Sequence, residues 1–242
     1  MGNNSGNCII CGQGPTVKSH LFPRALMFDI RAEGDAVVQG SRHRDGVRYL
    51  QSGEWDDRFL CKTHEDCIGA GDDYAIRFCR SIPTTSWPSF AGQASAVRNA
   101  QPNKLLHFIY GTVWRHAMSA RNAADRLDLG RYEQVLRKSL LEEGPYDLQA
   151  LVARQNLTLG ELGRIDFAIN PYRQRLGELN TWHFAVGGLD FHLLTDQRRF
   201  DPQWAPFLAN GNEVLHLTSI DRKDIREVPM LRGLLDRMTA RS

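Results

Sequence analysis

The sequence predicts an α+β protein with a zinc-stapled finger at its N-terminus, a helical middle, a small C-terminal antiparallel sheet and a closing helix. Three observations predict this class. Cysteine and histidine residues stand in pairs near both ends of residues 8–67. Apolar residues repeat at helical spacing between residues 103 and 121. Between residues 164 and 194 they alternate with polar residues, as they do in strands.

The finger is predicted from its metal ligands. Cys8 and Cys11 form a Cys-x2-Cys knuckle, and Cys61 is followed by His64 and then by Cys67. Zinc takes four tetrahedral ligands, prefers thiolate and imidazole, and can hold together a segment too small to fold by burial alone. Cys8, Cys11 and Cys61 are three predicted ligands. His64 is the favoured fourth ligand because of its two-residue gap, with Cys67 as the alternative; the competing interpretation is a set of buried free cysteines.

Short elements are expected between and after these ligands. Residues 17–22 should be extended, because they lead into Pro23, and residues 24–30 should form a short helix or turn. Brief strands are expected at 36–38 and 47–50. A helix is expected over 64–80, interrupted in its first half by Gly69 and Gly71.

The rest of the chain changes from helical to strand periodicity. Helices are predicted at 103–121, 131–143 and 146–155, and a closing helix at 221–240. Strands are predicted at 164–169, 181–186, 189–194 and 213–217, with Gly187-Gly188 as a hairpin turn. The resulting division is a zinc finger at 1–80, a linker or ordered loop at 81–102, and an α+β domain of unknown role at 103–242.

Composition describes an ordinary globular protein, with 42% apolar and 24% charged residues. The net charge of +2 gives only a weak indication of polyanion binding. The chain has five cysteines, an odd number, and Cys8 and Cys11 stand in Cys-x2-Cys spacing. Both facts suit metal binding in a reducing compartment better than a set of disulfides. No signal peptide or long apolar run is present, so a cytoplasmic protein without a membrane partner is expected. Phosphate-binding and dinucleotide-binding glycine motifs are absent from the sequence.

Three segments together resemble a known family. The knuckle at 8–11 (CIIC), the element at 19–23 (SHLFP) and the element at 60–65 (LCKTHE) resemble the zinc-containing branch of the HNH endonucleases, which have a ββα-metal or treble-clef finger. More narrowly, residues 19–23, residues 59–65 and the segment 106–119, which contains 114–115 (WR), resemble a group of uncharacterised bacterial proteins. The first likeness covers about residues 8–80, and the second extends to about residue 120. The likeness to the HNH endonucleases implies an enzyme with a structural Zn²⁺ that acts on DNA, or less readily on RNA. The likeness to the bacterial proteins implies, by association, a role in defence against mobile DNA.

The resemblance also implies roles for individual residues. His20 occupies the place of the general base, and a Mg²⁺ or Mn²⁺ would stabilise charge on the scissile phosphate. The chain departs from the family pattern, because Ser19 precedes the histidine where an acidic or histidine ligand is often found. A catalytic metal site would therefore need carboxylates, with Glu65 and Asp73 as candidates, or it is absent. For both residues the alternative interpretation is a solvated helix carboxylate.

The alternative function is a non-catalytic zinc module that binds nucleic acid or a partner protein. Residues 103–242 would then serve as the interaction domain, for a protein partner or for a homo-oligomer. Trp114 and Arg115 are interpreted as a core residue and a structural ion pair, and His183 and His192 as ordinary sheet residues.

Overall fold

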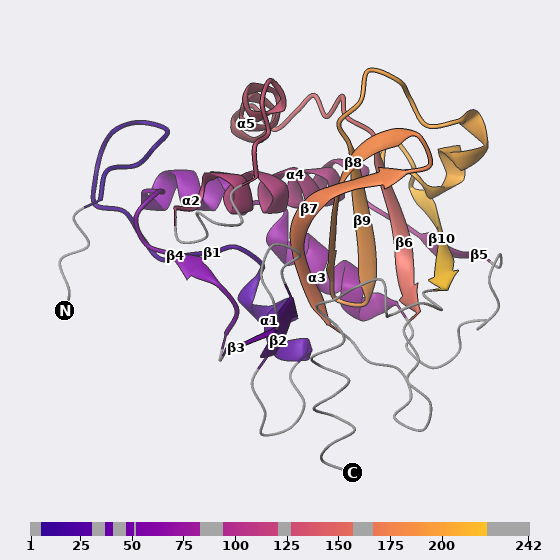
Figure 1. The fold of residues 1–242 in the computed structure, drawn as a ribbon, viewed down its shortest axis with the longest axis horizontal. Coiled ribbons are helices and arrows are strands. Elements are labelled where there is room, and N and C mark those ends of the chain that lie inside the picture. The colour runs from indigo at the N-terminus through magenta and orange to yellow at the C-terminus, as the bar shows by residue number, and fades with distance from the viewer. Residues whose placement is uncertain are drawn as a thin grey trace, which may run out of the picture.

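The fold of the chain is given by a computed structural model, which describes residues 6–30, 37–40, 47–50, 52–82, 94–120, 127–156 and 167–221 (Figure 1). Helices and sheets are mixed, so the predicted α+β class is confirmed. The strands form a two-stranded sheet near the N-terminus and an eight-stranded sheet that combines β2, β3 and β5 with the strands of the C-terminal half.

The N-terminal part contains a two-stranded sheet followed by a helix, beside a cysteine knuckle. Strand β1 (Ser19–His20) pairs antiparallel with β4 (Trp55–Asp56), and helix α2 (Lys62–Ile68) follows. Helix α1 (Arg24–Asp29) and strands β2 (Val37–Gly40) and β3 (Val47–Leu50) lie between β1 and β4 in the sequence. Strand β2 pairs parallel with β7 of the large sheet, so this N-terminal part is connected directly to the C-terminal half.

The helix predicted over residues 64–80 is two helices. Helix α2 ends at Ile68, and α3 (Asp72–Ser81) begins after a short turn. Gly71 in this turn lies against the backbone of α4, where an added Cβ would come within 2.5 Å of the Phe108 nitrogen and 2.7 Å of the Lys104 oxygen. The break therefore lets α3 approach α4 closely, which a larger residue would prevent.

The large sheet has the strand order β3-β2-β7-β8-β9-β6-β10-β5. Its remaining strands are β5 (Ala94–Arg98), β6 (Ala150–Asn156), β7 (Ala168–Leu176), β8 (Leu179–Val186), β9 (Leu189–Leu194) and β10 (Val214–Asp221). Two pairings, β2 with β7 and β6 with β10, are parallel, and the others are antiparallel. The sheet is therefore mixed and has more strands than the sequence pattern predicts.

Helix α4 (Pro102–Met118) is the central element of the core (Figure 1). Every residue from Leu105 to Ala117 is buried, and the Phe108 ring lies 6.0 Å from that of Phe184 and 5.5 Å from that of Phe191. Helix α5 (Tyr132–Leu141) packs beside α4 and α2. One hydrophobic cluster runs from Cys8 through α4 to Leu217, so the finger and the sheet share a core.

A second, smaller cluster covers the other face of the sheet. The short 3-10 helix η3 (Pro202–Phe207) contributes to it, with Leu151 and Leu194 from the sheet. On this face His183 pairs with His192 in the strand register, the two rings stack at 4.4 Å, and Asp190 lies 2.8 Å from the His183 Nε2. Both histidines are sheet residues, as expected.

Two predicted segments differ in the structure, and a third lies mostly outside the described residues. The helix predicted at 146–155 is wrong, because residues 150–156 form β6 between β9 and β10. Residues 150–153 are buried on both faces, and such a continuous apolar run does not distinguish a central strand from a helix. Strand β5 lies within the predicted linker and forms the edge beside β10. Residues 222–240 of the predicted closing helix lie outside the described residues, and Asp221 ends β10.

Other predictions agree closely. Strand β9 has the predicted bounds, and Gly187 and Gly188 form the predicted turn, with φ angles of 61° and 75° that favour glycine. Residues 168–169 of the strand predicted at 164–169 belong to β7, while 164–166 lie outside the described residues.

Candidate metal centre and the adjoining histidine site

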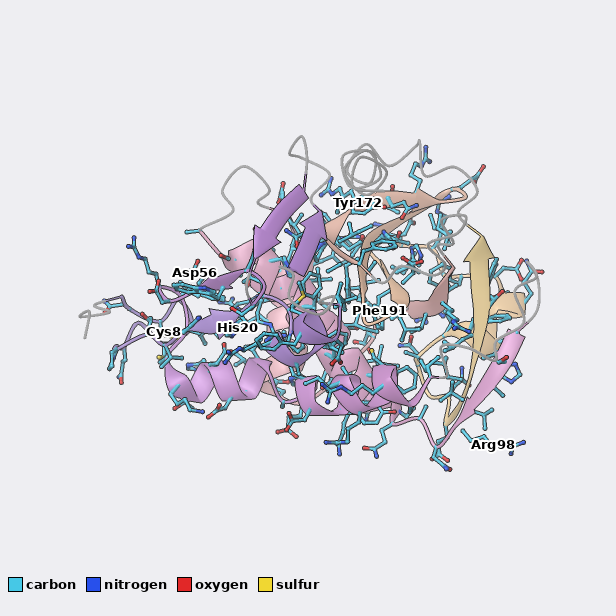
Figure 2. All side chains as sticks on the ribbon, turned by 90° about the horizontal axis from the view of Figure 1, so that it is seen from below. Cys8, His20, Asp56, Arg98, Tyr172 and Phe191 are labelled. Carbon is cyan, nitrogen blue, oxygen red and sulfur yellow. The ribbon has the colours of Figure 1, made fainter. Side chains whose placement is uncertain are left out.

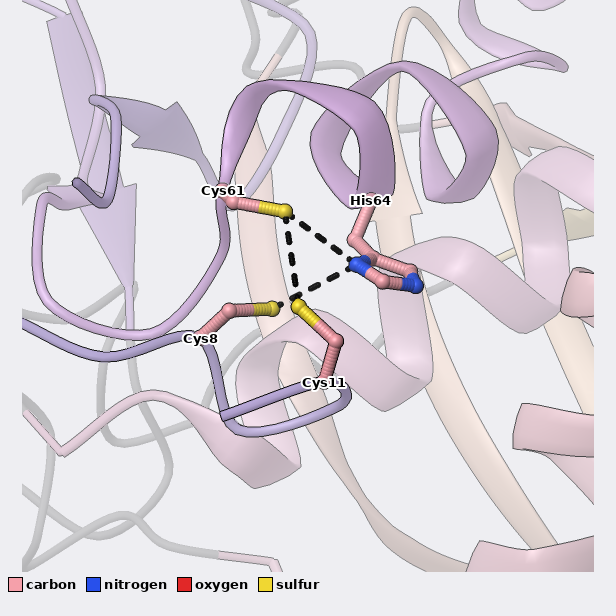
Figure 3. Close-up of side chains that lie close together, drawn as sticks. All are labelled: Cys8, Cys11, Cys61 and His64. Carbon is pink, nitrogen blue, oxygen red and sulfur yellow. Dashed lines mark hydrogen bonds between the residues drawn. The ribbon is translucent and has the colours of Figure 1, made fainter. Parts of the chain in front are cut away.

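Cys8, Cys11, Cys61 and His64 direct their side chains towards one point (Figure 3). Their ligand atoms all lie within 4.8 Å of one another. The Nδ1 atom of His64 is 3.2 Å from the Cys61 Sγ and 3.5 Å from the Cys8 Sγ, and the Cys11 and Cys61 sulfurs are 3.9 Å apart. Tetrahedral zinc with its usual bond lengths places such atoms about 3.6–3.8 Å apart. The cluster therefore has the size and the donors of a Cys3His zinc site.

Local backbone structure places these ligands. The knuckle turns at Gly12, where φ is 71°, and the Gly12 N–H donates to the Cys8 carbonyl at 2.7 Å. Ile9 N–H donates to the Phe59 carbonyl, which holds the knuckle against the chain leading to Cys61. Cys61 is the N-cap of α2 and His64 lies in the first turn, so one helix start supplies both of the later ligands.

The predicted choice between His64 and Cys67 is decided by geometry. His64 belongs to the four-residue group, and Cys67 does not. Cys67 instead contacts α5, where its thiol donates to the Leu140 carbonyl at 3.4 Å. Burial raises the pKa of the Cys67 thiol, so it stays protonated at neutral pH.

Cys8 differs from Cys67 in its surroundings. Burial alone would raise the pKa of the Cys8 thiol, but the backbone N–H groups of Cys61, Cys11 and Ile10 outweigh burial and lower the pKa to about 6. The site thus stabilises a thiolate, the form of cysteine that binds metal.

His20 lies at the end of β1, half-buried and opposite Trp55 (Figure 2). Its Nε2 atom is shielded from solvent and has no hydrogen-bond partner among the described residues. Burial, followed by the positive charges of Lys18, Arg24 and Arg115, lowers its pKa to about 4. The imidazole is therefore neutral at pH 7 and is surrounded by cationic side chains.

Glu65 lies in the first turn of α2, and its Oε2 atom is also buried without a partner among the described residues. Burial raises the pKa of this carboxyl, while the Arg115 guanidinium and the Ser19 hydroxyl oppose the shift. Ser19 precedes His20 in β1 and is fully buried. Glu65 and His20 are therefore both close enough to Arg115 for its charge to act on their pKa values.

Arg115 reaches this site from α4, outside the finger. Its side chain is 1% exposed, and its two terminal nitrogens donate to the two carboxylate oxygens of Asp72 at 2.8 Å each. The Arg115 Nε atom is buried and unpartnered among the described residues. The neighbouring Trp114 is buried and donates its Nε1–H to Glu133 at 3.1 Å. The interpretation of Trp114 and Arg115 as core and ion pair is confirmed, and Arg115 in addition borders the histidine site.

The end of α4 is also fixed to β4. Asp56, fully buried, accepts hydrogen bonds from the Ser119 hydroxyl at 2.7 Å and from the Ala120 N–H at 3.1 Å. It accepts a further bond from the Arg58 N–H at 3.0 Å. Because Asp56 pairs with Ser19 in the strand register, this network holds β1 and α4 together beside His20.

The predicted site residues are only partly brought together. His20 and Glu65 border Arg115, whereas Asp73 is exposed at the start of α3. Across the described ranges, the Cys3His cluster is the one group of three or more potential metal ligands, and it contains neither Glu65 nor Asp73. Asp72 is one of the carboxylates near Glu65 in the sequence, but the sequence pattern does not single it out, and its neighbour Asp73 was the predicted site residue. The helical spacing of α3 could have distinguished them, because Tyr74, Ala75 and Phe78 mark its buried face.

Comparisons of the chain with protein-family models, with curated proteins and with solved structures gave no match. Of the helices in the described part of the chain, none has the length and apolar character needed to cross a bilayer.

Proposed function

We propose that the chain is a metal-dependent HNH-like endonuclease that hydrolyses nucleic-acid phosphodiesters, with DNA as the favoured substrate, His20 as general base and a structural zinc. One observation carries the proposal. The charge of Arg115 on α4 acts on the pKa values of both His20 of β1 and Glu65 of α2, and β1, β4 and α2 form a strand-strand-helix unit beside the Cys3His cluster. This is the order of elements expected for a zinc-containing ββα finger.

The electrostatics of the site suit a phosphodiester substrate. Lys18 and Arg24 add positive charge beside the neutral His20. This positive charge attracts an anionic substrate. His20 then takes a proton from an attacking water, and the water oxygen bonds to phosphorus. The bond from phosphorus to the leaving oxygen breaks, and that oxygen takes a proton from solvent.

Glu65 is the proposed protein ligand of the catalytic Mg²⁺ or Mn²⁺. Its buried Oε2 atom has no partner among the described residues. Mg²⁺ sites commonly combine one or two carboxylates with water and substrate phosphate oxygens, so a single carboxylate can suffice. When bound, the cation would supply charge stabilisation at the phosphate. Asp73 is exposed and is not included in this proposal.

Cleavage assays on plasmid and single-stranded DNA test the proposal. The zinc-loaded protein is expected to cleave with Mg²⁺ or Mn²⁺ and not without added divalent cation. Loss of a general base lowers the rate by roughly 100–10,000-fold, so His20→Ala should abolish detectable cleavage. Glu65→Gln should also be inactive, and Asp73→Asn, a change of an exposed carboxylate, serves as the matched active control.

Three results would contradict the proposal. Cleavage that persists in His20→Ala would assign the activity elsewhere. Equal loss in Asp73→Asn and Glu65→Gln would remove the case for Glu65. The absence of cleavage by folded, zinc-loaded protein on DNA and RNA would favour the second candidate function below.

The pKa of His20 should respond to its cationic neighbours. Removal of one positive charge stabilises the imidazolium, so Lys18→Gln should raise the His20 pKa from about 4 towards the ordinary value of 6.5. NMR titration of the His20 ring protons measures this directly. Lys104→Gln, an exposed lysine on α4, is the control and should leave the titration unchanged. A His20 pKa near 6.5 in the unmodified protein would contradict the described burial and charge.

The second candidate function is a non-catalytic zinc module that binds nucleic acid or a partner protein. Two linked facts favour it. The described residues hold no second group of three metal ligands, and the His20 Nε2 is shielded from solvent. Binding without metal-dependent cleavage is the outcome that distinguishes this candidate from the endonuclease.

A further inference from the structure

A polar hollow opens where the start of α5 meets strands β8 and β9, away from the histidine site. Its volume is about 530 Å³, and its lining includes Arg131, Asn180, Asp196, Gln197 and Arg198. No element of the proposed cleavage chemistry uses these residues.

The hollow presents hydrogen-bond donors more than acceptors. Asp196, its carboxylate, already accepts from the Asn180 N–H and side-chain amide at 3.2 and 3.1 Å. It also accepts from the Arg198 backbone N–H, Nε and Nη2 at 3.0, 3.0 and 2.8 Å. Arg198 holds the pKa of this carboxyl well below its usual range, so the acid stays ionised and paired. The carboxylate oxygens of Asp196 are therefore occupied, and the exposed Arg131 is the charged group that the hollow offers to a ligand, which favours an oxyanion.

Two further arginines extend the donor surface along β7. Arg173 and Arg175 are both exposed, and Arg175 lies opposite Asn180 in the β7–β8 register. The Arg173 guanidinium lies 5.2 Å from the Trp182 ring centroid and donates to the Asp128 carbonyl at 2.8 Å, in the segment that leads to α5. Arg173 thus connects β8 with the segment that leads to α5, the helix whose start borders the hollow.

The charges of this surface are not fully neutralised. Arg131 lies 4.9 Å from the Tyr132 ring centroid and bonds its hydroxyl, and neither Arg131 nor Arg175 has an acidic partner within the described ranges. Stacking on aromatic rings orients a guanidinium before a ligand arrives, which reduces the entropy lost on binding. The arginine surface is defined as Arg131, Arg173, Arg175 and Arg198. Arg198 is paired with Asp196 and Glu178, so Arg131 and Arg175 supply the charge of this surface that remains for phosphate oxygens.

We propose that the arginine surface binds the phosphate backbone of the nucleic acid on which the finger acts. The inference depends on the proposed function for the identity of the polyanion. Helix α5 connects the finger with the arginine surface. Near its end, the Leu140 carbonyl accepts a hydrogen bond from the Cys67 thiol of α2, and Arg131 directly precedes its first turn. Exposed guanidinium groups without a base-reading helix suit backbone contacts, which set position and affinity rather than sequence choice.

Fluorescence anisotropy with a labelled DNA duplex and its single strand tests the surface. The His20→Ala background without added divalent cation separates binding from cleavage. The charge-removing variant is Arg131→Gln/Arg175→Gln, and the matched control is Arg77→Gln/Arg98→Gln, which removes two exposed arginines elsewhere. Arg98 lies at the opposite end of the molecule from His20 and far from Tyr172 of β7 (Figure 2).

The variant of the arginine surface should bind at least about tenfold more weakly at roughly 100 mM salt, and the slope of log K against log salt should shrink by about 2. The control should stay within about twofold of the parent protein. Equal loss in both double variants would show that net charge alone matters, and no loss in either would likewise overturn the proposal. Binding of heparin without binding of DNA or RNA would also overturn the proposal, because the surface would then attract polyanions without binding nucleic acid.

The binding assay and the cleavage assay test the two proposals separately. Weaker binding by Arg131→Gln/Arg175→Gln in a protein that never cleaves would support the surface and contradict the endonuclease. Metal-dependent cleavage combined with unchanged affinity in that variant would support the endonuclease and overturn the surface.

Discussion

Cys61→Ala should lose its zinc and at least about 3 kcal/mol of folding free energy. Cys61 is one of the four potential ligands and is also the N-cap residue of α2. Its replacement leaves three donors for the metal, and the start of α2 is no longer attached to the metal through Cys61. Binding free energy at a structural zinc is folding free energy, and apparent values of about 10–16 kcal/mol are typical. For a chain of this length the loss corresponds to a fall in Tm of about 6–12 °C. Elemental analysis and thermal unfolding measure the two effects.

The chain offers matched cysteine controls. Cys67→Ala removes a thiol that donates to the Leu140 carbonyl, and Cys79→Ala removes a buried thiol on α3; neither belongs to the ligand group. The unmodified protein and both variants are expected to bind one zinc per chain. Zinc loss in Cys67→Ala, with retention in His64→Ala, would show that the fourth ligand has been misassigned.

Arg115→Met should destabilise the fold by about 3–5 kcal/mol. The change leaves the Asp72 carboxylate, with a side chain only 19% exposed, without its bidentate partner. Breaking a buried ion pair from one side is costly because a charge stays in low dielectric surroundings. Urea unfolding of zinc-loaded protein measures the effect.

An exposed ion pair of similar geometry provides the control. Arg80 bonds both carboxylate oxygens of Asp29 at 2.8 and 2.9 Å, with side chains 54% and 38% exposed. Arg80→Met should cost no more than about 1 kcal/mol, because solvent screens this pair. The double variant Arg115→Met/Asp72→Asn should be less destabilised than Arg115→Met alone, since no charge is left uncompensated. A cost for Arg115→Met no greater than that for Arg80→Met would contradict the importance of the buried pair.

The zinc ligands were predictable from the sequence because knuckle spacing reports local geometry. A two-residue gap places Cys8 beside Cys11 in a tight turn and Cys61 beside His64 in the first turn of a helix. Strand β9 and its glycine turn were predictable for the same reason, since alternation and turn residues are local signals. These features do not depend on distant parts of the chain.

Features that depend on distant parts of the chain could not be predicted in this way. Residues 150–153 form a strand because β9 and β10 flank them, whereas their apolar run alone fits a helix equally well. The role of Arg115 beside His20 depends on how α4 packs against the finger, which no spacing within the sequence reports. The choice of Asp73 over Asp72 has the same origin, because the two adjacent residues differ only in which side of α3 they occupy.

The central claim of the proposed function is that His20 supplies the base for phosphodiester hydrolysis beside a zinc-stapled finger. The most direct measurement is the rate of Mg²⁺-dependent cleavage of a labelled DNA duplex by His20→Ala, with and without added imidazole. The account predicts no cleavage by the variant alone and partial recovery with imidazole, which can take the proton that the missing side chain would accept. Cleavage at the parental rate by the variant without imidazole would contradict the claim.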